Sequence, residues 1–293
     1  MSYFSCIISK KDDGKSLKAY LESFFLAKNK INYLIDNSCV VVNGEIIKNR
    51  AYLLNTNDEI NIDTSIYDGI DYPPLRYNLK ILYEDDYMLI VEKPSGVIIY
   101  SENKELENTM ANYVAYYYTK TNQNLAIRHV HRLDIDTTGC LVYAKNVLIH
   151  SILSNYFENN KTKKEYFALV YGIINNEGKI DKKIGRNRHE SGKMMVSNMG
   201  KDALTYFKPH TILKDKTLVN VCLKTGRTHQ IRVHLSSIKH PLLGDKLYGK
   251  KDSYSRVMLH CYHIGFVHPI TNIWIDFYAD LPKDMKKIIN EEK

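Results

Sequence analysis

The N-terminal part of the chain changes its hydrophobic period twice. Apolar side chains recur at helical spacing over residues 17–25 and again over residues 31–35. A short apolar run at residues 39–42 is then followed by Asn43-Gly44 and a second apolar pair. Asn-Gly between two such runs indicates a β-hairpin, because a type I′ turn requires a positive φ at both central residues. The pattern predicts two short helices, a hairpin and a closing strand at residues 59–62.

The segment at residues 67–79 interrupts these patterns. It contains Pro73-Pro74, which favours an extended polyproline conformation and removes backbone donors. We therefore predict a linker at residues 67–79 with few contacts across it. It would separate a small domain at residues 1–66 from a larger domain at residues 80–293.

Beyond the linker, alternating runs typical of strands are interspersed with helical patterns. Strands are predicted at residues 79–84, 87–92, 141–145, 166–171, 204–206 and 218–223, and helices at residues 108–120 and 228–238. This mixture of strands and helices indicates an α+β fold.

Net charge distinguishes the two predicted domains. The 293 residues carry a formal net charge of +8. Residues 1–66 contain eight basic and eight acidic side chains, so the whole excess lies in residues 67–293. A basic surface of this kind favours a polyanionic partner such as a nucleic acid.

Cysteine usage and hydropathy give expectations about location. The five cysteines are far apart and form no C-x-x-C pair, so we expect free thiols in a reducing cytoplasm. No apolar run approaches the ~18 residues of a membrane span, and no signal peptide is evident. We expect a monomer.

The histidines raise the question of a metal site. His129 and His131 are two residues apart, and His229 and His234 are five apart. Zinc sites in proteins favour i, i+4 pairs on helices or C-x₂₋₄-C spacing, so we expect no metal here. Glycine-rich phosphate loops are also absent from the sequence, so no nucleotide cofactor is expected.

The richest concentration of functional side chains is H-R-L-D-I-D-T-T-G at residues 131–139. This segment resembles the active-site loop of RluA-type pseudouridine synthases, in which the catalytic aspartate falls at the position of Asp134. Thr138 stands where that family usually has serine, and it keeps the hydroxyl group. An isolated H-R-L-D-I-D-T-T-G also suits an ordinary turn, so the resemblance depends on further segments.

Four further segments resemble the same family in the same order. They are K-P-S-G at residues 93–96, K-E-Y-F-A-L-V-Y-G at 164–172, G-K-D-A-L-T at 200–205 and L-K-T-G-R-T-H-Q-I-R-V-H-L at 223–235. The resemblance implies that Tyr166 stacks on the target base and that Arg227 pairs with Asp134. A carboxylate in a dry pocket needs a fixed cation to remain ionised, and a guanidinium does not lose its proton.

Residues 14–64 resemble the S-four domain, a small RNA-binding module. The resemblance places four cations near RNA phosphates: Lys28, Lys30, Lys48 and Arg50. Because this region has no net charge, a plain solvated surface is the alternative. Further candidates for RNA contact are His131 and Arg132 on the loop, which would otherwise hold it, and Arg186 and Arg188 in a basic loop.

Together these resemblances imply an RNA pseudouridine synthase. Its catalytic fold would be a mixed, mostly antiparallel sheet flanked by helices, and the target uridine would be flipped into the cleft. Large-subunit ribosomal RNA is the expected substrate, with transfer RNA as an alternative. A non-catalytic RNA-binding factor in ribosome assembly is a second alternative, against which the presence of Asp134, Tyr166 and Arg227 argues.

Overall fold

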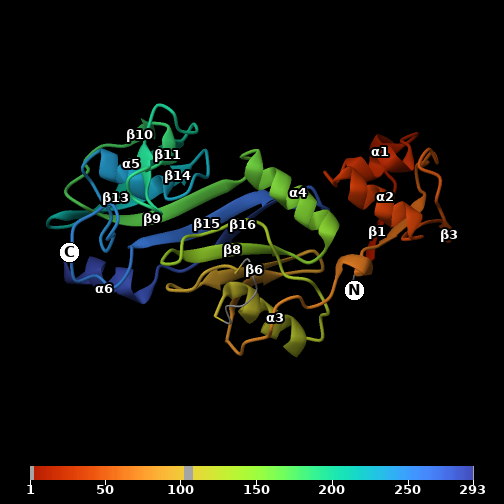
Figure 1. Ribbon diagram of the computed structural model, residues 1–293, viewed down its shortest axis with the longest axis horizontal. Helices are drawn as coiled ribbons and strands as arrows, with labels where there is room; N and C mark the ends of the chain where they lie inside the picture. The colour runs from red at the N-terminus through yellow and green to blue at the C-terminus, as the bar shows by residue number, and fades with distance from the viewer. Residues whose placement is uncertain (1–2, 102–107, 293) are drawn as a thin grey trace.

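The computed structural model describes residues 3–101 and 108–292. Its N-terminal unit is a four-stranded antiparallel sheet, in the order β1-β4-β2-β3, packed against two helices (Figure 1). The elements are β1 (Tyr3–Ile7), α1 (Leu17–Glu22), α2 (Lys28–Asp36), β2 (Val40–Val42), β3 (Glu45–Ile46) and β4 (Glu59–Asp63).

The predicted hairpin is present in this unit. Asn43 and Gly44 connect β2 to β3 with φ values of 50° and 86°, as a type I′ turn requires. Both predicted helices and the closing strand are confirmed, whereas β1 was not predicted.

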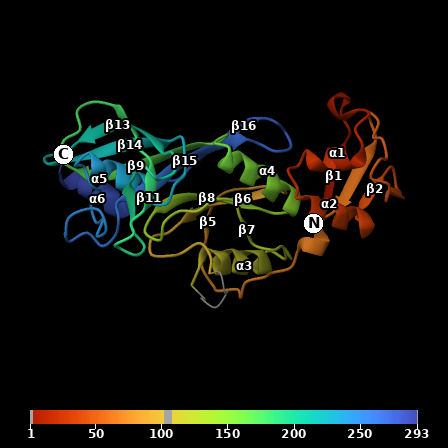
Figure 2. The ribbon, with the colours of Figure 1, turned by 45° about the horizontal axis from the view of Figure 1, so that its top comes forward.

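The larger part of the molecule is built on a ten-stranded sheet (Figures 1 and 2). Its strand order is β10-β13-β14-β9-β15-β8-β6-β5, with β16 paired to β15 and β7 paired to β8. The strands are β5 (Lys80–Glu84), β6 (Met88–Lys93), β7 (Arg128–His129), β8 (Thr138–Ala144), β9 (Lys163–Tyr171), β10 (Gly178–Asp181), β13 (Leu204–Ile212), β14 (Lys216–Leu223), β15 (Leu259–Val267) and β16 (Trp274–Tyr278). Among these pairings only β15 with β8 is parallel, so the expected mixed, mostly antiparallel sheet is confirmed.

Four helices flank this sheet, and a separate hairpin of β11 (Ile184–Arg186) and β12 (Met194–Val196) lies beside α5. The helices are α3 (Met110–Lys120), α4 (Val147–Glu158), α5 (Gln230–Ser237) and α6 (Lys283–Glu291). Helix α4 packs on β7 and β8, on the side of the main sheet nearer the N-terminal unit (Figure 1). The patterns predicted α3 and α5 but neither α4 nor α6.

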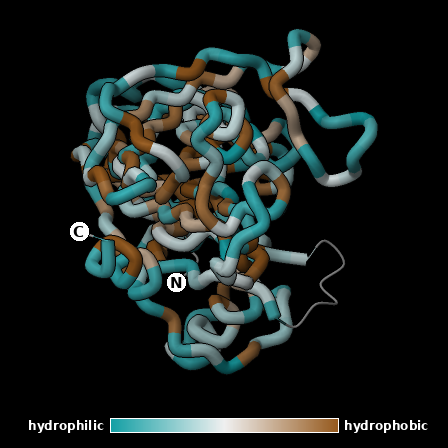
Figure 3. Tube along the Cα trace, turned by 90° about the vertical axis from the view of Figure 1, so that its left-hand side faces the viewer, coloured by the Kyte–Doolittle hydropathy of each residue, from teal (hydrophilic) through white to brown (hydrophobic). Residues whose placement is uncertain are grey.

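Hydrophobic residues concentrate inside the main body, and the projecting loops are mostly hydrophilic (Figure 3). Within the described residues, no helix has the length and apolar character needed to cross a membrane.

The predicted linker is extended, and it packs closely on the larger unit. The ring of Tyr77 stacks on Tyr113 of α3 at 4.1 Å between centroids. The Pro73 carbonyl accepts a hydrogen bond of 2.8 Å from the Asn112 side chain. The prolines keep the segment extended, and a tyrosine-rich helix gives it a surface to pack on. We call residues 67–79 the strap.

An ion pair also joins the strap to the main sheet. Asp68 of the strap pairs with Arg128 of β7 at 2.6 Å, and both side chains are almost inaccessible to solvent. The Arg128 guanidinium also donates to the carbonyl of Tyr67. Because burying one charge without the other is costly, this pair fixes the strap to the main sheet.

Candidate active site

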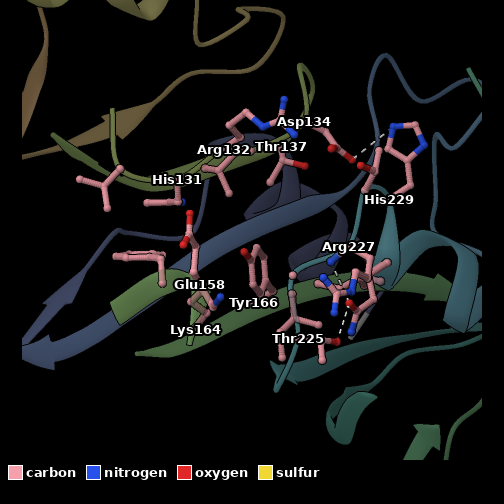
Figure 4. A pocket seen from close by; sticks show the side chains of 18 of the residues that line it. His131, Arg132, Asp134, Thr137, Glu158, Lys164, Tyr166, Thr225, Arg227 and His229 are labelled. Carbon is pink, nitrogen blue, oxygen red and sulfur yellow. Dashed lines mark hydrogen bonds and ion pairs between the residues drawn. The ribbon is translucent and has the colours of Figure 1, made fainter. Parts of the chain in front are cut away.

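A cleft of about 1030 Å³ opens over the central strands of the main sheet (Figure 4). Its lining comes from the loop after β7, from the C-terminal end of α4, from the start of β9 and from the turn that precedes α5. All three residues predicted to be catalytic, Asp134, Tyr166 and Arg227, line this cleft.

Lys93, the lysine of the K-P-S-G segment, fixes the loop that carries Asp134. Lys93 is fully buried. Its ammonium group donates to the carbonyls of Pro94 (2.8 Å), Ile135 (2.7 Å) and Thr137 (3.1 Å). Burial lowers the pKa of Lys93 to about 7, although the nearby Asp136 acts in the opposite direction. The lysine therefore joins the end of β6 to both sides of the loop.

The T-T-G end of the same loop enters the parallel strand pair. Gly139 has a φ of +114°, and a Cβ atom there would lie 2.1 Å from the carbonyl oxygen of Cys261. Only glycine fits both the conformation and the close approach of β15. The Thr138 hydroxyl forms a buried hydrogen bond of 2.8 Å with Nδ1 of His260, which gives the retained hydroxyl a structural role.

The cation beside Asp134 is Arg232. Its Nη1 atom lies 3.3 Å from Asp134 Oδ2. Its Nε and Nη2 atoms each donate to a carboxylate oxygen of Asp245 at 2.8 Å. This two-bond fork fixes the guanidinium plane, and Asp245 is fully buried. The cation is thus positioned before any substrate is bound.

The expected pairing of Arg227 with Asp134 is wrong. The Arg227 side chain is exposed at the edge of the cleft, and its Nε donates to the carbonyl of Asp202 at 2.9 Å. Arg227 precedes α5, whereas Arg232 lies in the first turn of that helix on its buried face. Both arginines lie in the segment at residues 223–235, and the sequence alone did not show which of them reaches Asp134.

His229 is a neighbour of Asp134 that the sequence analysis did not assign. It adopts a left-handed φ of 55°, and its Nε2 lies 3.8 Å from Asp134 Oδ2. Its Nδ1 lies 2.9 Å from the Tyr248 hydroxyl, which accepts a hydrogen bond of 2.8 Å from the Met194 backbone. Tyr248 therefore fixes the orientation of the His229 ring, with Nε2 facing Asp134.

Tyr166 lies on β9 with its side chain in the cleft (Figure 4). As predicted, Tyr166, Ala168 and Val170 share the buried face of the strand. Burial raises the pKa of the Tyr166 hydroxyl well above its ordinary value, so the side chain is a neutral phenol near pH 7.

Comparison with known proteins identifies the family. Residues 87–237 match the model of the RNA pseudouridylate synthase family. The RNA pseudouridine synthase YhcT of Bacillus subtilis is 37% identical, covering 96% of this chain and 95% of that protein. The ribosomal large subunit pseudouridine synthase D of Zymomonas mobilis is 32% identical, covering 89% of this chain and 88% of that protein. The chain belongs to the RNA pseudouridylate synthase family.

The fold agrees with this membership. The structure of human RNA pseudouridylate synthase domain containing 4 superposes with a TM-score of 0.60 at 22% identity, covering 71% of this chain and 90% of that one. The protein is an RNA pseudouridine synthase, as the sequence predicted. The family match begins at residue 87, so the S-four resemblance of residues 14–64 stays a prediction.

His131 and Arg132, the two loop residues expected to contact RNA, lie in different environments. His131 accepts a hydrogen bond of 3.2 Å from the Val142 backbone and stacks on Phe157. Burial lowers the pKa of His131 to about 3. It therefore holds the loop as a neutral ring, and contact between His131 and RNA stays a prediction. Arg132 is exposed at the edge of the cleft.

The four cations of the N-terminal unit that were predicted to contact RNA differ in how exposed they are and whether they are paired. Lys28 and Lys48 are exposed, whereas Lys30 is half-buried and its pKa is lowered by burial. Arg50 forms an ion pair of 2.6 Å with Asp36 and is therefore occupied within the N-terminal unit.

The basic hairpin lies beside the cleft. Arg186 ends β11 and lines the cleft, and Arg188 is exposed in the loop that follows. Among residues 3–101 and 108–292, no group of three or more histidine, cysteine or acidic side chains is arranged to hold a metal ion.

Proposed function

We propose that the enzyme converts uridines of large-subunit ribosomal RNA to pseudouridine and that Asp134 is its catalytic carboxylate. Relatives named ribosomal large subunit pseudouridine synthase D, from several bacteria, cover most of this chain at 30–32% identity. That shared length includes both the cleft and most of the N-terminal unit, which supports a common class of substrate.

The reaction is an isomerisation of one nucleotide. The N1–C1′ bond breaks and its electron pair leaves with the uracil. The base then turns, C5 bonds to C1′, the proton on C5 is released, and N1 takes up a proton. Asp134 acts on the ribose, either as a nucleophile or as a base, and both roles require an ionised carboxylate.

The observation that carries the assignment of Asp134 is its contact with Arg232. The guanidinium is held by Asp245 through two hydrogen bonds and presents its remaining edge to Asp134. An oriented cation of this kind stabilises the anion without rearrangement during the reaction. We therefore assign the pairing role to Arg232 and leave Arg227 to the edge of the cleft.

Tyr166 is assigned to stacking on the flipped base. Its ring faces the cleft, and stacking of a base on an aromatic side chain contributes about 1–3 kcal/mol. Because its pKa is raised by burial, the phenol is poorly suited to accept the C5 proton. Stacking is therefore its main role in this proposal.

RNA outside the active site would contact exposed cations on both units. These are Lys28 and Lys48 on the N-terminal unit, Arg132 and Arg227 at the edge of the cleft, and Arg186 and Arg188 on the hairpin. We propose that residues 1–66 are an S-four-like recognition domain and residues 80–293 the catalytic domain. We also propose that the enzyme acts as a monomer in the cytoplasm, where free cysteines are stable.

The test is a map of pseudouridine in total RNA from cells with and without the gene. One or more ribosomal sites should lose the modification, regain it with the wild-type gene and remain unmodified with Asp134→Asn. Loss confined to transfer RNA would reject the ribosomal target, and restoration by Asp134→Asn would reject the catalytic assignment.

A further inference from the structure

Six lysine and arginine residues of the described part of the chain are buried, each with no more than 8% of its surface exposed. They are Lys93, Lys145, Lys164, Lys216, Arg232 and Arg256. Five of them have clear partners: Lys93 contacts three carbonyls, and the other four form ion pairs of 2.8 Å or less with Glu84, Asp215, Asp245 and Asp284. Lys164 is the exception.

The ammonium group of Lys164 forms no hydrogen bond and no ion pair with any described residue. The side chain lines the cleft and is only 7% exposed. Its Nζ lies 5.5 Å from the centre of the Phe157 ring, and a Cβ on Gly226 would lie 3.7 Å from it. Glu158 lies at this end of the cleft (Figure 4) but forms no ion pair with Lys164.

A buried cation without a counter-charge destabilises a folded protein. Transfer of an ammonium group out of water is unfavourable unless it is paired or hydrogen-bonded. The effect is visible here, because burial lowers the pKa of Lys164 and no carboxylate opposes that change. Residues that destabilise the free protein are common where a ligand later satisfies them.

The position of Lys164 points to an RNA strand. Lys164 and Tyr166 alternate with Glu165 along β9 and therefore face the same side. Two strand residues span about 6.6 Å. A nucleotide whose base stacks on Tyr166 would bring its sugar and phosphates into this part of the cleft.

We propose that the Lys164 ammonium binds a backbone phosphate of the RNA strand whose uridine enters the cleft. RNA then supplies the counter-charge that the free protein lacks. A phosphate suits the site better than a uracil carbonyl, since each phosphate carries a full negative charge and accepts strong charge-assisted hydrogen bonds. This inference rests on the proposed function only in placing the uridine beside Tyr166.

The test compares Lys164→Met with Lys163→Met in the full chain. Lys163 is adjacent but its side chain is half exposed and pairs with Glu165 at 3.0 Å. The probe is an unmodified transcript of large-subunit ribosomal RNA, and its affinity is measured over a series of salt concentrations. Lys164→Met should weaken binding about ten-fold at low salt and reduce the slope of log K against log salt by about 0.7–0.9. Lys163→Met should change both values much less.

Thermal unfolding without RNA is a second measurement. Here Lys164→Met is expected to increase stability, whereas it is expected to decrease RNA affinity. Lys164→Met should raise the unfolding midpoint, because it replaces an unpaired buried charge with an apolar side chain of similar length. Loss of RNA affinity together with gain of stability is the combined result expected of a phosphate site. A lower midpoint would show that the ammonium has a protein partner and would overturn the proposal.

Two further results would also overturn it. One is unchanged affinity and salt dependence in Lys164→Met. The other is a slower single-turnover rate at saturating RNA with unchanged affinity, which would place the cation on the reacting base.

Glu158→Gln, which leaves Lys164 in place, should bind RNA at least as tightly as wild type; weaker binding would count against the proposal. If wild-type enzyme leaves ribosomal uridines unmodified while Lys164→Met still weakens RNA binding, the ribosomal target fails and the phosphate site stands.

Discussion

The two ends of the cleft handle charge in different ways. At the Asp134 end, Arg232 is fixed by Asp245, and His229 is oriented by Tyr248. At the other end, the buried Lys164 side chain forms no hydrogen bond or ion pair with the described residues, and its ammonium lies over the ring of Phe157. The Asp134 end, to which we assign catalysis, is thus organised before substrate arrives, whereas in our proposal the Lys164 end is completed by the RNA. In this proposal, catalysis uses a cation that already has a carboxylate partner, whereas RNA recognition uses a cation that has none.

The largest effect expected from this comparison is that of Asp134→Asn. The substitution keeps the shape of the side chain and removes its charge, so the fold should survive. Activity should fall below about one thousandth of wild type, while RNA affinity changes no more than a few-fold. Release of tritium from RNA labelled at uridine C5 measures the reaction. Turnover near the wild-type rate would show that the organised end does not contain the essential carboxylate.

Arg232→Lys and Arg227→Lys test which arginine serves Asp134. Lysine at position 232 cannot maintain a fork to Asp245 and also reach Asp134, so single-turnover rates should fall about a hundred-fold. Arg227 is exposed, and its replacement should change the rate about three-fold or less. The reverse order of effects would mean that the active complex uses a pairing different from that of the free enzyme.

Tyr166 lies between the two ends, and its variants separate stacking from proton transfer. Tyr166→Phe keeps the ring and should bind RNA nearly as well as wild type. Tyr166→Ala should lose about 1–3 kcal/mol of binding free energy. Equal affinities for the two variants, measured with the same RNA, would contradict a stacking role.

The smallest expected effect is a pH dependence of stability at the binding end. Burial lowers the pKa of Lys164 below its ordinary value of 10.5. The destabilisation is therefore full below the folded-state pKa and disappears as the pH rises toward 10.5. The gain in unfolding midpoint from Lys164→Met should be larger near pH 7 than near pH 10. An equal gain at both pH values would show that charge is not its cause.

Local patterns predicted much of the fold because their causes are local. The Asn43-Gly44 turn follows from the φ values that those residues tolerate, and the alternation around Tyr166 follows from strand geometry. Helix α4 was missed because apolar residues occur on most of its faces, which hides the helical period. The packing of the strap was not predicted, because it depends on Tyr113 of α3, which is distant in sequence.

The site could be predicted by position but not by pairing. The segments around Asp134 and Tyr166 both line the cleft. Which arginine reaches Asp134 depends on where α5 begins and on the left-handed conformation of His229. Such boundaries are uncertain by a few residues in any pattern-based prediction. That Lys164 lacks an ion pair is likewise visible only in three dimensions, since it depends on no carboxylate of the described residues lying within ion-pair distance of its ammonium.

The packed strap limits how far the N-terminal unit can move relative to the cleft, because the chain is anchored to the larger unit from Asp68 onward. A flexible tether would let two RNA-binding surfaces search independently, with an effective concentration determined by tether length. Here the Tyr77–Tyr113 stack and the Asp68–Arg128 ion pair restrict that search. In our proposal both units bind RNA, so an RNA whose structured element lies at the matching distance from the target uridine would gain from binding both surfaces.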